Sequence, residues 1–121
     1  MLPAPYRMTR SLDFGQTVGR GARAAQSTLV VHSLRSPGDR TEPPKVGLVV
    51  SKSVGNAVVR HRVSRRLRHV ARSVLEDMEP GDRLVIRALP PSRDAGSERL
   101  ERELVSAFGR ARAGGRAGGR R

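Results

Sequence analysis

Hydrophobic and polar positions along this 121-residue chain follow two periods, one typical of strands and one typical of helices. Short β-branched runs at residues 28–34 (TLVVHSL), 45–51 (KVGLVVS) and 83–88 (RLVIRA) predict three strands. The turn-rich loop SPGDRTEPP separates the first two runs, so we predict that these two strands pair as a hairpin.

Three helices are predicted around these strands. A short helix begins at a Ser11 cap and runs to about residue 18, and the last helix begins at a Ser97 cap. The middle helix runs from an Asn56 cap to about residue 75, and its aliphatic residues share a stripe of about 80° on a helical wheel. These residues are Val59, Val63, Leu67, Val70 and Val74. The order α-β-β-α-β-α predicts an α+β fold, a two-layer α/β sandwich.

The two ends of the chain depart from this pattern. Pro3 and Pro5 disfavour a helix, so residues 1–8 are predicted to form an extended arm. The sequence RAGGRAGGRR at the other end contains only Gly, Ala and Arg and has no residues that could build a core. We therefore predict one domain over residues 1–112 and a disordered basic tail over residues 113–121.

Charge changes this picture because it is concentrated on the middle helix. The chain has 24 Lys and Arg against 11 Asp and Glu, a formal net charge of +13. Residues 43–75 contain eight basic residues and no acidic one. A solvated helix face normally mixes both signs through i, i+4 pairs, whereas the six arginines of residues 60–72 have no such partner in sequence. This arrangement favours a polyanion as the binding partner.

Composition excludes several other classes of protein. No cysteine is present, which removes disulfides, thiolate metal sites and a cysteine nucleophile. No apolar run is long enough to span a membrane, and the N-terminus lacks a signal-peptide core, so we expect a cytoplasmic protein without a membrane partner. The three histidines have no metal-binding spacing, and no nucleophile and base are spaced for catalysis, so no protein side chain is predicted to be catalytic.

One segment resembles a known signature. VGLVVSKSVGNAVVRHRVSRRLR is similar to the motif of the bacterial ribonuclease P protein subunit, in which a strand ending in V-S-K precedes x-x-G-N-A-V-x-R-N-R-x-K-R-x-x-R. The similarity extends to residues 7–14, to TLVVHSL, to the PGD-x-x-V-I segment at residues 80–86 and to the last helix. Two positions depart from the motif, since His61 replaces the usual Asn and Ser64 replaces the usual Lys.

The resemblance implies a function and a set of site residues. The family is the protein partner of a catalytic RNA that removes the 5′ leader of precursor tRNA by hydrolysis, at Mg²⁺ ions bound mainly by the RNA. Carried over, the residues that contact the RNA subunit are Lys52, Asn56, Arg60, His61, Arg62, Arg65, Arg66 and Arg68. The cleft for the single-stranded leader falls between the first helix and the sheet, at Phe14, Val18 and His32. The family fold is an α/β sandwich with a left-handed β-α-β crossover.

Alternatives remain at this point. A structural ribosomal protein of similar fold would carry the same charge and tail, and an unaided nuclease would need a residue such as His61. Phe14 could be a core residue, and His32 could be an ordinary buried histidine in an apolar strand. Because the family often has aromatic residues at positions 18 and 32, base stacking in this chain would depend mainly on Phe14.

Overall fold

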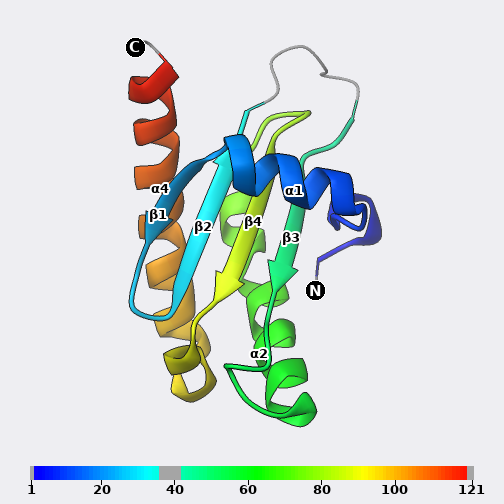
Figure 1. Cartoon of the computed structure of the whole chain (residues 1–121), viewed down its shortest axis with the longest axis vertical. Helices are drawn as coiled ribbons and strands as arrows, with labels where there is room; N and C mark the ends of the chain where they lie inside the picture. The colour runs from blue at the N-terminus through cyan, green and yellow to red at the C-terminus, as the bar shows by residue number, and fades with distance from the viewer. Residues whose placement is uncertain (1, 36–41, 120–121) are drawn as a thin grey trace.

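The computed structural model describes residues 2–35 and 42–119, and in this part of the chain four strands form one sheet (Figure 1). The strands are β1 (Ala22–Ala25), β2 (Leu29–Leu34), β3 (Lys45–Val49) and β4 (Arg83–Ala88). Their order in the sheet is β1-β2-β4-β3. The β1/β2 and β2/β4 pairs are antiparallel, whereas β3 and β4 run parallel.

Helices cover the two faces of the sheet unequally. On one face α1 (Ser11–Arg20) crosses the strands, and on the other lie α2 (Ala57–Val70), α3 (Arg72–Leu75) and α4 (Ser97–Gly119) (Figure 1). Two short 3-10 helices, η1 (Ala4–Tyr6) and η2 (Pro90–Asp94), precede α1 and α4. The rest of the face that α1 crosses carries no helix, and we call this part the open face of the sheet (Figure 1).

The core lies between the sheet and the helices α2, α3 and α4. Four members of the predicted stripe on the middle helix, Val63, Leu67, Val70 and Val74, are buried there, and Val59 packs against them. The sheet contributes alternate residues such as Val31 and Ile86, as expected for strands that have one face in the core. The predicted α+β sandwich and its aliphatic core are therefore confirmed.

Helix starts agree with the predictions only in part. Asn56 caps α2 as predicted, because its Oδ1 accepts a hydrogen bond from the backbone N–H of Val59 at 2.9 Å. The caps predicted at Ser11 and Ser97 are wrong, because each serine is already the first helical residue. The N-cap of α1 is Arg10, and no side chain caps that end of the helix.

The predicted hairpin between the first two strands is wrong. β2 pairs instead with β1, a strand that the sequence pattern did not predict, through a turn in which the Gln26 N–H donates to the Leu29 carbonyl at 2.8 Å. β4 lies between β2 and β3 and pairs with both. β1 (ARAA) contains no β-branched residue, which explains why its composition did not indicate a strand.

The connection from β3 through α2 and α3 to β4 is a β-α-β crossover. In Figure 1 both strands point downward, β4 lies to the left of β3, and α2 lies behind the sheet. This arrangement is left-handed, because a right-handed connection between the same strands would pass in front of the sheet. It is the rare hand that the family resemblance implies.

Both chain ends contain more regular structure than predicted, and the N-terminal arm is not extended throughout, because Ala4–Tyr6 form the 3-10 helix η1. Arg7 forms a bridge with Val46, and the Met8 N–H donates to the Val46 carbonyl at 2.8 Å, so the N-terminal arm runs along the edge of β3. At the other end α4 continues as a helix to Gly119, where a disordered tail was predicted from residue 113. The predicted boundary at residue 112 therefore does not coincide with the end of an element, and residues 120–121 lie outside the described part of the chain.

Candidate nucleic-acid interface

The basic residues of the sequence motif lie on one side of the molecule, on α2 and on the turn before it. Burial of the aliphatic stripe directs the remaining side chains outward: Lys52, Asn56, His61, Arg62 and Arg65 are exposed, and Arg60, Arg66 and Arg68 are half-buried. Within the described residues no carboxylate forms an ion pair with any of these basic side chains. The structure thus gathers the motif into one cationic face of α2 that has no internal counter-charge.

Two of these residues also contribute to the fold, and the side chain of a third is half-buried. Asn56 uses its Oδ1 to cap α2, and the Arg66 Nη1 donates to the Ala95 carbonyl at 3.0 Å. The Nε of Arg60 is buried, and no hydrogen-bond partner occurs among the described residues. The exposed residues Arg62 and Arg65 are therefore the clearest candidates for contacts to a partner molecule.

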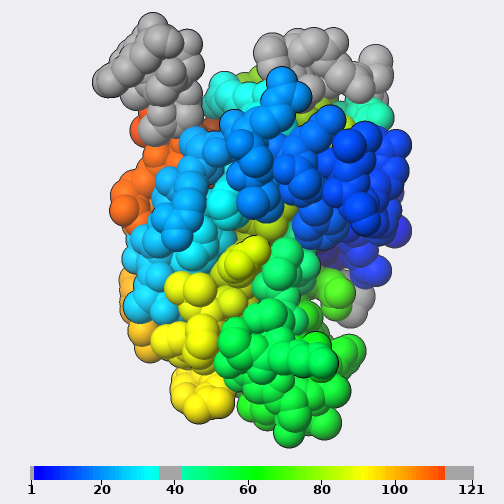
Figure 2. Space-filling view, viewed as in Figure 1, coloured from blue at the N-terminus to red at the C-terminus, as the bar shows by residue number. Residues whose placement is uncertain are grey.

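A second candidate surface is the open face of the sheet beside α1. Figure 2 shows this face, with α1 (blue) above and the residues around the start of α2 (green) below. Phe14 on α1 lies half-buried against β3, so close that a Cβ atom on Gly47 would come within 2.5 Å of its ring. Phe14 is thus held at the edge of this surface by contact with the sheet backbone.

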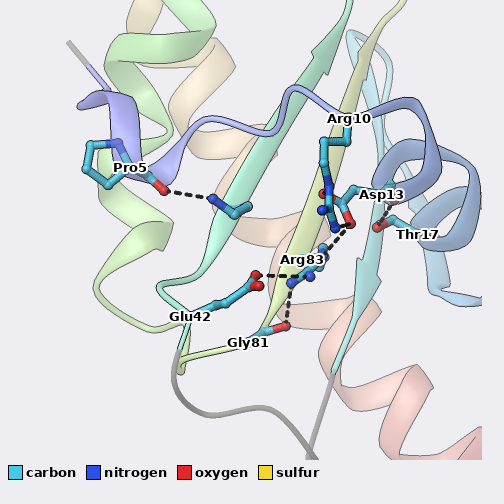
Figure 3. Close-up of polar contacts among 8 residues, drawn as sticks. Pro5, Arg10, Asp13, Thr17, Glu42, Gly81 and Arg83 are labelled. Atoms are coloured by element: carbon cyan, nitrogen blue, oxygen red, sulfur yellow. Dashed lines mark hydrogen bonds and ion pairs between the residues drawn. The ribbon is translucent and has the colours of Figure 1, made fainter.

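A buried carboxylate holds α1 in this position (Figure 3). Asp13 on α1 accepts hydrogen bonds from Arg10 and, across the interface with the sheet, from Arg83 on β4, each at 3.2 Å. Arg83 also pairs with Glu42 at 3.4 Å. Burial raises the pKa of Asp13, but the hydrogen bonds from Arg10 and Arg83 outweigh it and leave the pKa below its ordinary value. The charged form of Asp13 therefore stabilises the crossing of α1 over the sheet.

The other two predicted cleft residues differ in accessibility. Val18 on α1 is 38% exposed, whereas His32 on β2 is only 8% exposed. His32 lies opposite Arg23 on β1 and Val85 on β4, so all three point to the open face of the sheet. Arg87, two residues after Val85, points to the same face. Burial, followed by the charges of Arg23 and Arg87, lowers the pKa of His32 below its ordinary value.

Arg23 and Arg87 are surface residues that the sequence motif does not contain. Each lies in a short strand, and nothing in the sequence indicates that β1 and β4 both flank β2. Strand alternation alone could have placed Arg87 on one face of its own strand. Its position diagonal to His32 depends on the pairing register, which only the structure provides.

A cavity of about 270 Å³ lies at the edge of β3, where the N-terminal arm runs. Phe14 and Thr9 line it from the α1 side, Val46 and Leu48 from β3, and Arg68 from α2. One residue of the motif on α2, Arg68, and one residue of the predicted leader cleft, Phe14, therefore line the same cavity.

Two absences complete the description of the site. Within residues 2–35 and 42–119, no three His, Asp or Glu side chains lie close enough together to hold a metal ion. In the same residues no helix is both long enough and apolar enough to cross a membrane.

These features define a small, basic α+β protein of the RNA-binding class. The family model Ribonuclease P matches residues 2–112, and the chain belongs to this family. It is 64% identical over 110 residues to the ribonuclease P protein component of Mycolicibacterium gilvum. The aligned region covers 91% of this chain and 89% of that one. It is 63% identical over 112 residues to the same component of Mycolicibacterium vanbaalenii, with 93% and 94% covered.

Solved structures show the same fold. The ribonuclease P protein of Staphylococcus aureus superposes with a TM-score of 0.75 at 23% identity, covering 88% of this chain and 94% of that one. The ribonuclease P protein of Thermotoga maritima gives a TM-score of 0.68 at 18% identity, with 83% and 92% covered. The comparisons confirm the resemblance seen in the sequence motif, and they do not favour the ribosomal-protein alternative. Family membership places the chain in a tRNA-processing ribonuclease complex. Its partners in general are the RNA of that complex and precursor tRNA.

Proposed function

We propose that this chain is a cytoplasmic subunit that binds the catalytic RNA through the cationic face of α2 and the 5′ leader of precursor tRNA through the open face of the sheet. Hydrolysis of the leader is then carried out by the RNA, and the protein contributes binding and orientation. The observation that supports this division is the cavity that Phe14 and Arg68 line together. One RNA surface and one substrate strand can be held side by side there.

The residue roles follow from position and charge. Exposed arginines on α2 carry forked donors that suit phosphate oxygens, and the absence of described ion-pair partners leaves their charge available to RNA. We assign contacts to the RNA subunit to Lys52, Asn56, Arg60, His61, Arg62, Arg65, Arg66 and Arg68. Phe14, Val18 and His32 are assigned to the leader, with Phe14 as the stacking platform.

Mg²⁺ is assigned to the RNA partner on the basis of the family resemblance. The described side chains offer no cluster suited to this ion, whose preferred ligands are carboxylate and other oxygen atoms. The proposed role of the protein therefore involves no metal ion held by its own side chains. The protein's part in the reaction is to neutralise phosphate charge next to the substrate, which raises the affinity of the RNA for precursor tRNA at low Mg²⁺ concentration.

Reconstitution tests this function. The purified chain alone is expected to leave precursor tRNA uncut, and adding the catalytic RNA at low Mg²⁺ is expected to restore a mature 5′ end. Failure of the folded chain to stimulate the RNA would contradict the proposal. Co-purification with ribosomal particles would instead support a structural ribosomal role, and cleavage by RNA-free protein that is lost in His61→Ala would support an unaided nuclease.

A further inference from the structure

We infer that Arg23, His32 and Arg87 form a site for one phosphodiester group of single-stranded RNA, and that this phosphate binds together with a proton on His32. The inference rests on the proposed leader surface and adds to it a specific anion site and a proton linkage. Both depend on residues of the open sheet face that lie outside the sequence motif.

The geometry is set by strand pairing. Arg23 on β1 is the direct cross-strand partner of His32, and Arg87 on β4 is the diagonal neighbour of His32, since His32 pairs with Val85. Direct partners have Cβ atoms about 5 Å apart, and diagonal neighbours are about 7–8 Å apart, within reach of long side chains. Two guanidinium groups therefore flank one imidazole ring on the same face of the sheet.

Among the described residues, the buried Nδ1 of His32 has no hydrogen-bond partner, and the side chains of Arg23 and Arg87 have no ion-pair partner. His32 is 8% exposed, and its Nδ1 is buried without a hydrogen-bond partner among the described residues. Arg23 and Arg87 are exposed, and within the described part of the chain neither side chain forms an ion pair. Two cations without counter-charges beside a largely buried imidazole repel each other and disfavour the charged ring in the free protein, and an anion bound between them would offset this repulsion.

Among residues 2–35 and 42–119, no carboxylate near His32 is available as a counter-charge. The charged groups that face it are Arg23 from β1 and Arg87 from β4. On α1, Asp13 is already bound to Arg10 and to Arg83, the other arginine of β4 on this face. The helix α4 packs against the opposite face of β2. An external anion is therefore the missing counter-charge.

The chemistry of the three groups selects a phosphodiester. Guanidinium groups donate forked hydrogen bonds to phosphate oxygens, and a protonated imidazole donates from both ring nitrogens. In the free protein burial and the two neighbouring arginines lower the pKa of His32, which favours the neutral ring. A bound phosphate adds negative charge beside the ring and raises this pKa, so binding takes up a proton from solvent. Affinity is then highest at low pH and falls as the pH rises through the pKa of the bound state.

This linkage is specific to a chain with histidine at this position. An apolar aromatic residue there would stack on a base but would not titrate. In this chain the sheet offers a titratable ring between two arginines at this position. Recognition of the leader at this point should therefore depend on the phosphate backbone and on pH, and little on base identity.

Two measurements test the inference. In the first, the affinity of the reconstituted holoenzyme is compared for precursor tRNA with a leader and for the same tRNA without one, at pH 5.5 and pH 7.5. The affinity gain due to the leader should be larger at pH 5.5, changing by at most about tenfold per pH unit. His32→Gln should make this gain independent of pH, whereas His69→Gln, the same change on an exposed α2 histidine outside the assigned contacts, should leave the pH dependence intact.

In the second measurement, the ring of His32 is titrated by NMR in the full chain with and without a short oligouridylate. The pKa of His32 should rise when the oligonucleotide binds. Arg23→Gln and Arg87→Gln should each abolish most of this rise and reduce the log–log salt slope of leader binding by about 0.7. Arg102→Gln, an exposed arginine on α4, is the matched control and should change neither quantity.

The outcomes separate this inference from the function on which it rests. Should His32→Gln fail to fold, His32→Phe keeps a ring of similar size, and it too should remove the pH dependence. A leader that adds affinity equally at both pH values, or a His32 pKa that does not respond to oligouridylate, would overturn the inference and leave the proposed function standing. A holoenzyme that neither cuts precursor tRNA nor gains affinity from its leader would overturn the proposed function itself.

Discussion

Gly47 has no side chain, and the ring of Phe14 packs in the space that this leaves. The ring of Phe14 occupies the space in which a side chain at position 47 would lie, with Cε1 and Cζ at 2.5 and 2.6 Å from the position that a Cβ atom would take. Gly47→Ala would force the ring to move, since real Cβ contacts are longer than this. We expect a loss of about 1–3 kcal/mol in the free energy of unfolding from overpacking, together with weaker binding of the leader.

The comparison that isolates this effect uses a second glycine. Gly109 on α4 has open space within 4 Å of the position that a methyl group would take, so Gly109→Ala should be neutral or should stabilise the helix by up to about 1 kcal/mol. Binding of Gly47→Ala to the RNA subunit should be unchanged, because α2 is not disturbed. Equal affinity of wild-type protein and Gly47→Ala for precursor tRNA would show that Phe14 does not contact the leader.

Asn56 combines two roles that can be separated by substitution. Its Oδ1 satisfies the Val59 N–H at the start of α2, so Asn56→Ala should lower the free energy of unfolding by about 1 kcal/mol. Asn56→Asp keeps the cap but replaces an amide donor with a negative charge beside the RNA. Thermal unfolding together with RNA-subunit affinity distinguishes the roles: Asn56→Asp should remain stable yet bind RNA less tightly. Retained RNA affinity in Asn56→Asp would leave capping as the function of this residue.

At the scale of elements, α2 is the part of the molecule that the sequence describes best. Its aliphatic stripe, its cap and its exposed basic face all arise from one local period, so no knowledge of distant residues is needed. Arg65 lies on the exposed face. If α2 contacts about five phosphates, the log–log salt slope of RNA-subunit binding should be about −3.5 to −4.5.

Arg65→Ala should reduce the magnitude of that slope by about 0.7 to 0.9, with no change in thermal stability. Titrations of RNA binding at several salt concentrations measure the slope directly. Arg102→Ala on the exposed side of α4 serves as the control and should leave the slope as it is. A slope that is the same for Arg65→Ala and for wild-type protein would place Arg65 outside the contact surface.

The sheet shows where local patterns stop being informative. Two strands that follow each other in sequence usually pair, which is why the sequence predicts a hairpin of β2 and β3. The pairing fails because β4, more than 30 residues further along, inserts between them. Which arrangement is more stable depends on how α2 and α4 pack on the sheet. A short stretch of sequence does not contain this packing energy. The parallel pairing of β3 with β4 can therefore be predicted only from the family resemblance, through the β-α-β crossover that it implies.

For the whole molecule, the same limit explains which site residues the sequence reveals. The motif on α2 is contiguous in sequence, so the sequence alone is sufficient to locate it. The open sheet face is assembled from α1, β1, β2 and β4, and its arginines become recognisable only when the strand register places them beside His32. Site residues that are contiguous in a sequence motif can be found from the sequence. Site residues that come together only through the pairing register of separate strands can be found only from a structure.

Two carboxylates each fix a helix to the sheet, one on each face, and both have a lowered pKa. Asp13 fixes α1 on one face. On the other, Glu103 of α4 accepts hydrogen bonds from the Thr28 N–H at 2.9 Å and from the Ser27 hydroxyl at 2.8 Å, at the turn between β1 and β2. Burial raises the pKa of Glu103, but these bonds, with those from the Thr28 hydroxyl and Arg99, lower it from 4.5 to about 2.

A carboxylate whose pKa is lower in the folded state stabilises the protein fully above its unfolded pKa and loses that contribution as the pH falls toward the folded value. The free energy of unfolding should therefore decrease between about pH 4.5 and pH 2, the interval that the pKa of Glu103 defines. Glu103→Gln should be less stable than wild-type protein at pH 7 by about 1.5–3 kcal/mol, because it loses charged hydrogen bonds. Its stability should also decline less steeply in acid. Urea unfolding at a series of pH values measures both effects, with Glu98→Gln in the first turn of the same helix as the control. Parallel curves for Glu103→Gln and wild-type protein would show that Glu103 does not account for the acid sensitivity, which would then fall to Asp13 and its contact with Arg83.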